Sequence, residues 1–172
     1  MANIGNNNPS NMRLFKSHSF RLFPSLFFTF LMLISGCATT APQNLFTISG
    51  PSWHVEQGQG LWTPRRGAPQ FGGDLVLATD ANGRSFVQFN KTPLTIVTAQ
   101  IAPGHWLLRF PQNGQAWAGH GAAPKRTIWP YLADALAGKS LPKPLHFEQE
   151  SNGNWRLENT KTGETLEGFL SP

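Results

Sequence analysis

The chain has 172 residues, of which 40% are hydrophobic and only 13% charged, with 17 glycines, 14 prolines and six tryptophans. This length suits one ordinary domain, and so apolar a composition argues against a disordered chain, a coiled coil and a helical bundle. The formal net charge is +5, but the first 36 residues hold three bases and no acid, so the remainder is nearly neutral. The remaining bases match no nucleic-acid-binding motif, and we expect no nucleic-acid partner.

The amino-terminal segment has the charge and hydropathy order of a secretory signal peptide. Arg13, Lys16 and Arg21 precede an apolar run over residues 22–34. Such a run is too short to cross a hydrocarbon core of about 30 Å comfortably. It ends in Leu-Ile-Ser-Gly-Cys at residues 33–37, an aliphatic-small-small-cysteine order that resembles the lipobox of bacterial lipoproteins.

The lipobox resemblance implies that residues 1–36 are removed and that Cys37, the only cysteine, becomes the acylated amino terminus. Each buried CH₂ of an acyl chain contributes about 0.8 kcal/mol, so more than one chain makes the anchoring stable. The alternative is a plain signal peptide or short anchor with an incidental cysteine. A solitary cysteine excludes an internal disulfide. Because the polar residues 6–11 are atypical of a signal start, Met12 is an alternative start to Met1.

Residues 37–44 form a polar tether, and residues 45–172 are expected to fold as a single domain. Turn sequences such as Asn113-Gly114 and Asn152-Gly153 separate short apolar runs, several of which alternate apolar and polar residues. This pattern predicts a meander of β-hairpins. We interpret Glu164 and Glu167 as charges at a strand edge. The predicted strands span residues 52–56, 75–78, 85–90, 95–101, 105–110, 115–119, 145–150, 155–159 and 165–170.

One segment departs from the strand pattern. Residues 128–137 carry apolar side chains at three- and four-residue spacing, Thr127 is a suitable cap, and Gly138 follows the last apolar residue. This predicts one amphipathic helix of about ten residues. The expected fold is β-rich α+β, a curved antiparallel sheet (an unclosed β-barrel of about eight or nine strands) with one helix laid over its concave face.

The sequence carries no pattern of catalytic or metal-ligating residues. His54, His105, His120 and His146 are widely separated, and none lies at an i, i+4 or His-x-His spacing with a carboxylate partner, which argues against a metal site. The sequence contains no nucleophile-elbow or phosphate-loop motif, and its only cysteine is assigned to the anchor. We therefore expect no enzymatic activity, no cofactor and no metal.

Large aromatic and aliphatic side chains are abundant in the expected domain. All six tryptophans and seven of the thirteen phenylalanines follow residue 36. A single sheet covered by one short helix leaves part of its concave face open, so we predict an apolar cavity for an acyl chain or lipid. The alternative is that these rings fill the core. The residues predicted to line the cavity are Leu75, Leu77, Phe89, Trp106, Leu108, Phe110, Leu132, Leu136 and Trp155.

A second apolar feature lies in the Gly- and Pro-rich stretch over residues 58–73. There Leu61 and Trp62 precede Arg65 and Arg66. An apolar loop tip beside two bases suits a membrane interface or lipid headgroups. The equally weighted alternative is that Leu61 and Trp62 form an early strand packed inward.

The lipobox, the short hairpins and the late helix together resemble the LolA/LolB group of lipoprotein-localisation factors. The resemblance rests on Ala-Gly-Lys-Ser-Leu-Pro at residues 137–142 and on the ending at 155–159 and 163–168, and it covers about residues 46–170. It implies an unclosed β-barrel, lidded by helices, around an apolar cavity for acyl chains. This chain is shorter than that group, has one lid helix, and offers Leu61 as the best match to the protruding leucine of the family.

The resemblance implies an outer-membrane lipoprotein that faces the periplasm. The residue after Cys37 is Ala38 and not the aspartate that retains enterobacterial lipoproteins at the inner membrane. We expect a non-catalytic monomer, attached to the membrane by its acyl groups, that binds a lipid or the acyl chain of a lipoprotein. The alternative is a structural or interaction lipoprotein of the envelope with a filled core and no small-molecule ligand.

Overall fold

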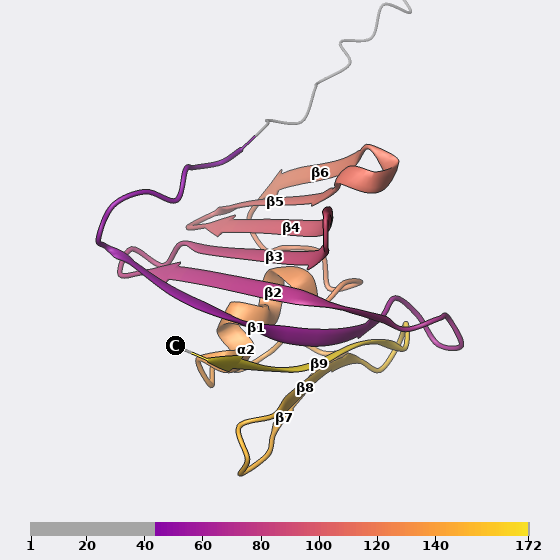
Figure 1. Cartoon of the computed structure of the whole chain (residues 1–172). Coiled ribbons are helices and arrows are strands. Elements are labelled where there is room, and N and C mark those ends of the chain that lie inside the picture. Colours follow the sequence, from indigo (N-terminus) through magenta and orange to yellow (C-terminus); the bar gives the residue numbers. More distant parts are fainter. Residues whose placement is uncertain (1–43, 172) are drawn as a thin grey trace, which may run out of the picture. The chain divides into compact units, whose positions relative to one another are not determined.

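Nine antiparallel strands form one continuous sheet in residues 44–171, the part of the chain that the computed structural model describes (Figure 1). Their order across the sheet is β6-β5-β4-β3-β2-β1-β9-β8-β7. The sheet stays unclosed, with β6 and β7 as its edges. The strands are β1 (Trp53–Thr63), β2 (Phe71–Asp80), β3 (Ser85–Lys91), β4 (Leu94–Ala102), β5 (His105–Phe110), β6 (Gln115–His120), β7 (Leu145–Gln149), β8 (Trp155–Asn159) and β9 (Glu164–Ser171).

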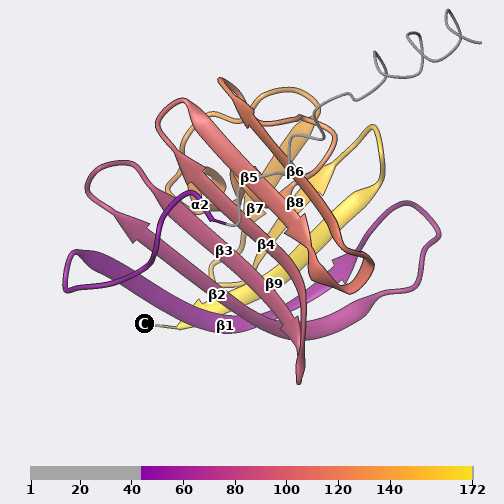
Figure 2. The ribbon, with the colours of Figure 1, turned by 90° about the horizontal axis from the view of Figure 1, so that it is seen from above.

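The first six strands form consecutive hairpins, as the turn sequences predict. The chain then crosses the concave face, and β7, β8 and β9 extend the sheet on its other side, where β9 pairs with β1. Viewed from above, the strands curve around the segment that carries the helix (Figure 2). The predicted fold class, a curved and unclosed antiparallel sheet with one short helix, is confirmed.

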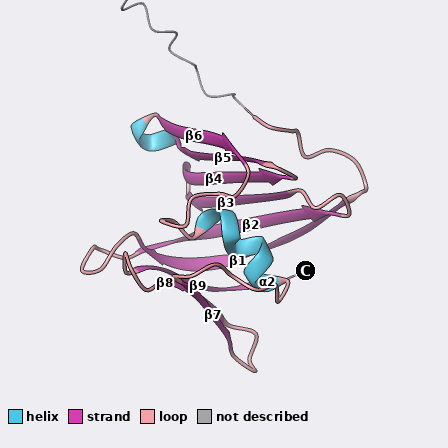
Figure 3. Cartoon of the chain, turned by 180° about the vertical axis from the view of Figure 1, so that it is seen from behind, coloured by secondary structure: helices cyan, strands magenta, loops and turns pink. Residues whose placement is uncertain are grey.

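The helix spans a 3₁₀ turn, η2 (Trp129–Tyr131), followed without a break by α2 (Leu132–Leu136). A further 3₁₀ turn, η1 (Pro111–Asn113), connects β5 to β6. Figure 3 shows α2 lying across one face of the sheet. The helix ends where Gly138 adopts a φ of 68°, a left-handed conformation that glycine reaches without strain. It is slightly shorter than the predicted range 128–137.

Strand β1 is longer than the predicted residues 52–56. The sequence did not predict its second half, because the Gln- and Gly-rich stretch there lacks the alternation of apolar and polar residues that marks a strand. Its pairing with β2 on one side and β9 on the other extends it to Thr63. A Cβ atom on Gly58 would lie 1.9 Å from the carbonyl oxygen of Phe169, and one on Gly73 would lie 2.2 Å from that of Asn90. Glycine at these positions therefore permits the close approach of neighbouring backbones within the sheet.

The core occupies the concave face. Alternate residues of the central strands point inward, among them Leu75, Phe89 and Val97, and the opposite half of the sheet contributes Leu157 and Leu166. These side chains pack against Ile128, Trp129 and Leu132 of the helical segment. The helix therefore buries its apolar face against both halves of the sheet.

Candidate ligand cleft on the concave face

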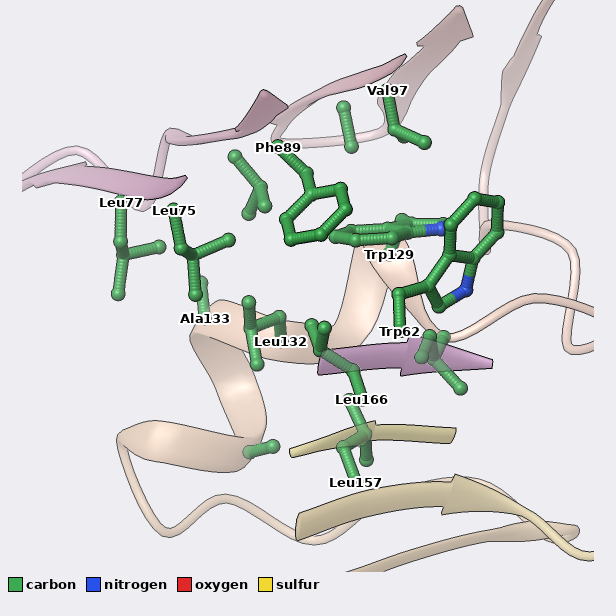
Figure 4. Packing of buried hydrophobic residues seen from close by; sticks show 14 of the residues in the cluster. Trp62, Leu75, Leu77, Phe89, Val97, Trp129, Leu132, Ala133, Leu157 and Leu166 are labelled. Carbon is green, nitrogen blue, oxygen red and sulfur yellow. The ribbon is translucent and has the colours of Figure 1, made fainter. Parts of the chain in front are cut away.

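Aromatic rings fill the centre of the concave face. Trp129 is fully buried, and its ring centroid lies 5.3 Å from that of Trp62 and 5.4 Å from that of Phe89 (Figure 4). Edge-to-face and tilted contacts at these distances are favourable packing geometries for aromatic side chains. The rings therefore meet in the middle, where the sequence predicted a cavity.

The nine residues predicted to line one cavity do not line a common cavity, so that prediction is wrong. Trp106 lies apart from the main cluster, with its ring packed against Gly119. Three others, Leu77, Leu136 and Trp155, border a cleft beside α2. The remaining five belong to the packed core or lie against it: Leu75, Phe89, Leu108, Phe110 and Leu132. The reason is the size of Trp129, which occupies the space enclosed by the curve of the sheet.

The cleft between α2 and the sheet has a volume of about 330 Å³. Leu77, Leu170 and Trp155 come from the sheet, and Ala133 and Leu136 come from the helix. Polar side chains of β1, β2 and β7 also line the cleft. The cleft therefore offers both an apolar wall for a hydrocarbon tail and polar groups for a head group. These polar residues are Glu56, Thr79 and Gln149.

A buried carboxylate fixes the start of the helical segment to the sheet. Glu164 on β9 is 4% exposed. Its Oε1 accepts hydrogen bonds from Trp62 Nε1 at 3.1 Å and Thr127 Oγ1 at 3.4 Å, and its Oε2 accepts one from the amide of Ile128 at 3.1 Å. Burial raises the pKa of Glu164 to about 7, although these hydrogen bonds act in the opposite direction.

Asn159 supports the same segment from β8. Its Nδ2 donates to the carbonyl oxygen of Lys125 at 2.9 Å, while its Oδ1 accepts from the amides of Lys161 and Thr162. The partners of Glu164 and Asn159 are backbone groups, an indole and a hydroxyl, so the arrangement anchors the chain and offers no acid–base pair. The interpretation of Glu164 as an edge charge is wrong. Its position two residues before Leu166, on the same face of β9, is the signal that could have revealed it.

The prediction that Leu61 and Trp62 form an exposed membrane-contact loop is wrong. Both lie within β1, where neighbouring residues point to opposite faces. Trp62 points into the core and is 7% exposed, whereas Leu61 is 37% exposed on the convex face. In the described residues, the most exposed large apolar side chain is Leu94 at 50%, beside the turn that joins β3 to β4. The sequence signal for this position is the Thr92-Pro93 turn directly before a leucine.

Several predictions concern residues outside the described range. Cys37, the leader at 1–36, most of the tether at 37–44 and the choice between Met1 and Met12 all lie there. Within residues 44–171, no helix is both long and apolar enough to span a membrane. In the same range, no group of three or more His, Cys, Asp or Glu residues is placed to hold a metal ion.

The domain belongs to the class of curved antiparallel sheets with one helix packed into the concave side, and its cleft lies between that helix and the sheet. Comparison with known protein families and with curated proteins finds no match to this chain.

Proposed function

We propose that this chain is a lipoprotein of the outer membrane that faces the periplasm, anchored through Cys37, and that it binds one acyl chain or lipid tail without catalysis. The observation that carries the binding proposal is the cleft of about 330 Å³ between α2 and the concave face. This volume lies at the lower end of the range of about 300–1,000 Å³ for small-molecule pockets, which favours a single chain over a lipid with several chains.

The lining of the cleft supports an amphipathic ligand. Leu77, Leu136 and Trp155 provide apolar contact for a hydrocarbon chain. Burial of an acyl chain against such walls contributes about 0.8 kcal/mol per CH₂ removed from water. Thr79 and Gln149 supply hydroxyl and amide groups for the polar end of the ligand.

Leu94 is the proposed point of contact with a membrane or an acylated cargo. Its side chain is half exposed at the turn between β3 and β4, beside Lys91 and Pro93. An apolar side chain next to a base suits the boundary between acyl chains and anionic headgroups. Leu94 therefore replaces Leu61 as the counterpart of the protruding leucine implied by the LolA/LolB resemblance.

The test uses a chain that begins at Ala38, so that no anchor competes for the cleft. Native mass spectrometry detects copurified lipid. Quenching of tryptophan emission by an added fatty acyl probe measures the affinity of the protein for that probe. We expect Leu136→Gln to weaken probe binding at least tenfold, because Leu136 lines the cleft. Leu61→Gln, a matched change on the convex face, should leave the affinity unchanged. A chain that carries no lipid and does not respond to the probe would contradict the proposal.

A second candidate function follows from the filled centre of the sheet. The contacts of Trp129 with Trp62 and Phe89 occupy the place where a large acyl cavity was expected. This packing favours a structural or interaction lipoprotein of the envelope without a small-molecule ligand. The negative outcome of the acyl-probe experiment would leave this second function as the better one.

A further inference from the structure

Two histidines that are 15 positions apart in the sequence are brought together by the hairpin of β5 and β6. His105 and His120 are directly paired across the two strands. Their ring centroids lie 4.6 Å apart, with the ring planes at 63°. Directly paired residues project to the same face of a sheet, so both imidazoles occupy the convex face, opposite Trp106 and Leu108, and both are exposed.

The backbone around the pair is held on both sides. The amide of Gly121 donates to the carbonyl oxygen of Gly104 at 2.8 Å, which continues the ladder beyond the histidine pair. On the other side, Trp106 pairs with Gly119, and its ring packs so closely against Gly119 that a Cβ there would lie 2.6 Å from it. The two imidazoles are therefore presented by paired strand residues rather than by a loop.

The hydrogen bonding of His105 leaves one ring nitrogen available as a ligand. Its Nδ1 lies 3.2 Å from the carbonyl oxygen of Pro103. Because a carbonyl oxygen only accepts, this contact is a hydrogen bond in the tautomer whose Nδ1 carries the proton, and in that tautomer Nε2 keeps its lone pair. A histidine that binds a metal usually donates its other ring N–H to such a backbone carbonyl, which fixes its tautomer and orientation.

We propose that His105 and His120 form a binding site for a borderline divalent transition-metal ion. The two rings are close enough for one ion, with metal–nitrogen bonds of about 2.0–2.1 Å, to bridge them after rotation of the exposed side chains. Imidazole ligands suit Cu²⁺, Ni²⁺ and Zn²⁺, and Cu²⁺ binds tightest in the usual order of affinities. Because no third His, Cys, Asp or Glu of residues 44–171 joins the pair, water or an external ligand completes the coordination.

This site is separate from the proposed acyl cleft, which lies on the opposite face of the sheet. The sequence argued against a metal site because no histidine spacing suited one within a single element. Pairing across the two strands brings the imidazoles of His105 and His120 close together although they are 15 positions apart in the sequence. The site therefore depends on the register of β5 and β6 and is independent of the proposed lipid-binding function.

The test titrates the untagged full chain, in mild detergent micelles, with Cu²⁺, Ni²⁺ and Zn²⁺ separately by calorimetry. We expect one Cu²⁺ per chain, with Ni²⁺ and Zn²⁺ bound more weakly. The electron paramagnetic resonance spectrum of the Cu²⁺ complex should show splitting from imidazole nitrogen. His105→Asn and His120→Asn should each weaken Cu²⁺ binding at least tenfold.

The matched control is His146→Asn, an exposed histidine on β7 that contacts Glu148 at 3.1 Å. This change should leave the affinity unaltered, and circular dichroism should show that all variants retain the sheet. The site would be overturned by wild-type Cu²⁺ binding weaker than millimolar, or by the same affinity in the His105→Asn and His120→Asn variants as in the wild type. A loss of affinity in His146→Asn equal to that in the two site variants would also overturn it.

Discussion

Glu164 makes the stability of this domain depend on pH in a defined direction. Its pKa in the folded protein is about 7, against 4.5 for an ordinary glutamate. Between these two values the folded state retains a proton that the unfolded chain has already released. The contribution of Glu164 to stability is therefore fully present below about pH 4.5 and is lost as the pH rises through about 7.

The size of this effect follows from the shift in pKa. The rise from 4.5 to about 7, at about 1.4 kcal/mol per unit, corresponds to about 3 kcal/mol between acid and neutral solution. Such a difference is a large fraction of the usual stability of a small domain, about 5–15 kcal/mol. Glu164 is almost fully buried, so solvent screens little of this effect.

The perturbation is Glu164→Gln, which removes the titrating group and keeps an oxygen that can accept from Trp62 and Thr127. Its amide nitrogen faces the Ile128 amide in place of Oε2, so the variant loses one hydrogen bond at every pH. That constant loss is about 1–3 kcal/mol and does not alter the pH dependence. The difference in unfolding free energy between wild type and variant should therefore shift by about 3 kcal/mol between pH 4 and pH 8, in the direction that penalises the wild type at high pH.

The assay is urea unfolding at intervals from pH 4 to pH 8, followed by tryptophan emission. All other titratable groups are common to both proteins and cancel in the difference. Glu167→Gln is the matched control on the same strand, since Glu167 is partly exposed and pairs with Arg156 on the convex face. This control should cost at most about 1 kcal/mol, as for other exposed ion pairs. A difference between wild type and Glu164→Gln that stays constant from pH 4 to pH 8 would refute the reasoning.

Three further predictions concern packing, backbone contact and the anchor. Trp129→Ala should destabilise the domain by about 3–5 kcal/mol in urea unfolding, because it empties the centre of the core; a loss below about 1 kcal/mol would mean that the rings do not support the sheet. Gly73→Ala should lower the free energy of unfolding by at least about 1–3 kcal/mol, because its Cβ would lie 2.2 Å from the carbonyl oxygen of Asn90. A Cβ on the neighbouring Gly72 meets nothing within 4 Å, so Gly72→Ala should be nearly neutral. Equal effects of the two alanines would contradict the close-contact argument. Cys37→Ala should release the protein from membranes in fractionation, and a variant that remains bound after salt and alkaline washing would disprove anchoring by lipidation.

The strand and helix positions were predictable because they depend on local patterns. Short apolar runs between turn residues predict all nine strands to within a few residues, except for the two longest. The second half of β1 was not predicted, because residues 57–60 show no alternation of apolar and polar side chains. Its pairing with β2 and β9 makes that stretch extended. The same pairing turns Trp62 inward, which local composition could not indicate.

The composition and spacing of the residues establish the class of this domain, a β-rich sheet with one late helix, since alternation and helical periodicity are properties of neighbouring positions. Whether the aromatic rings would enclose a cavity or fill it depends on how far the sheet curves and where Trp129 is placed. The burial of Glu164 depends on the chain at Thr127 and Ile128 folding back over β9. The pairing of His105 with His120 depends on strand register. Each of these features joins residues remote in sequence, and distances between such residues are set only when the sheet and the helix pack together.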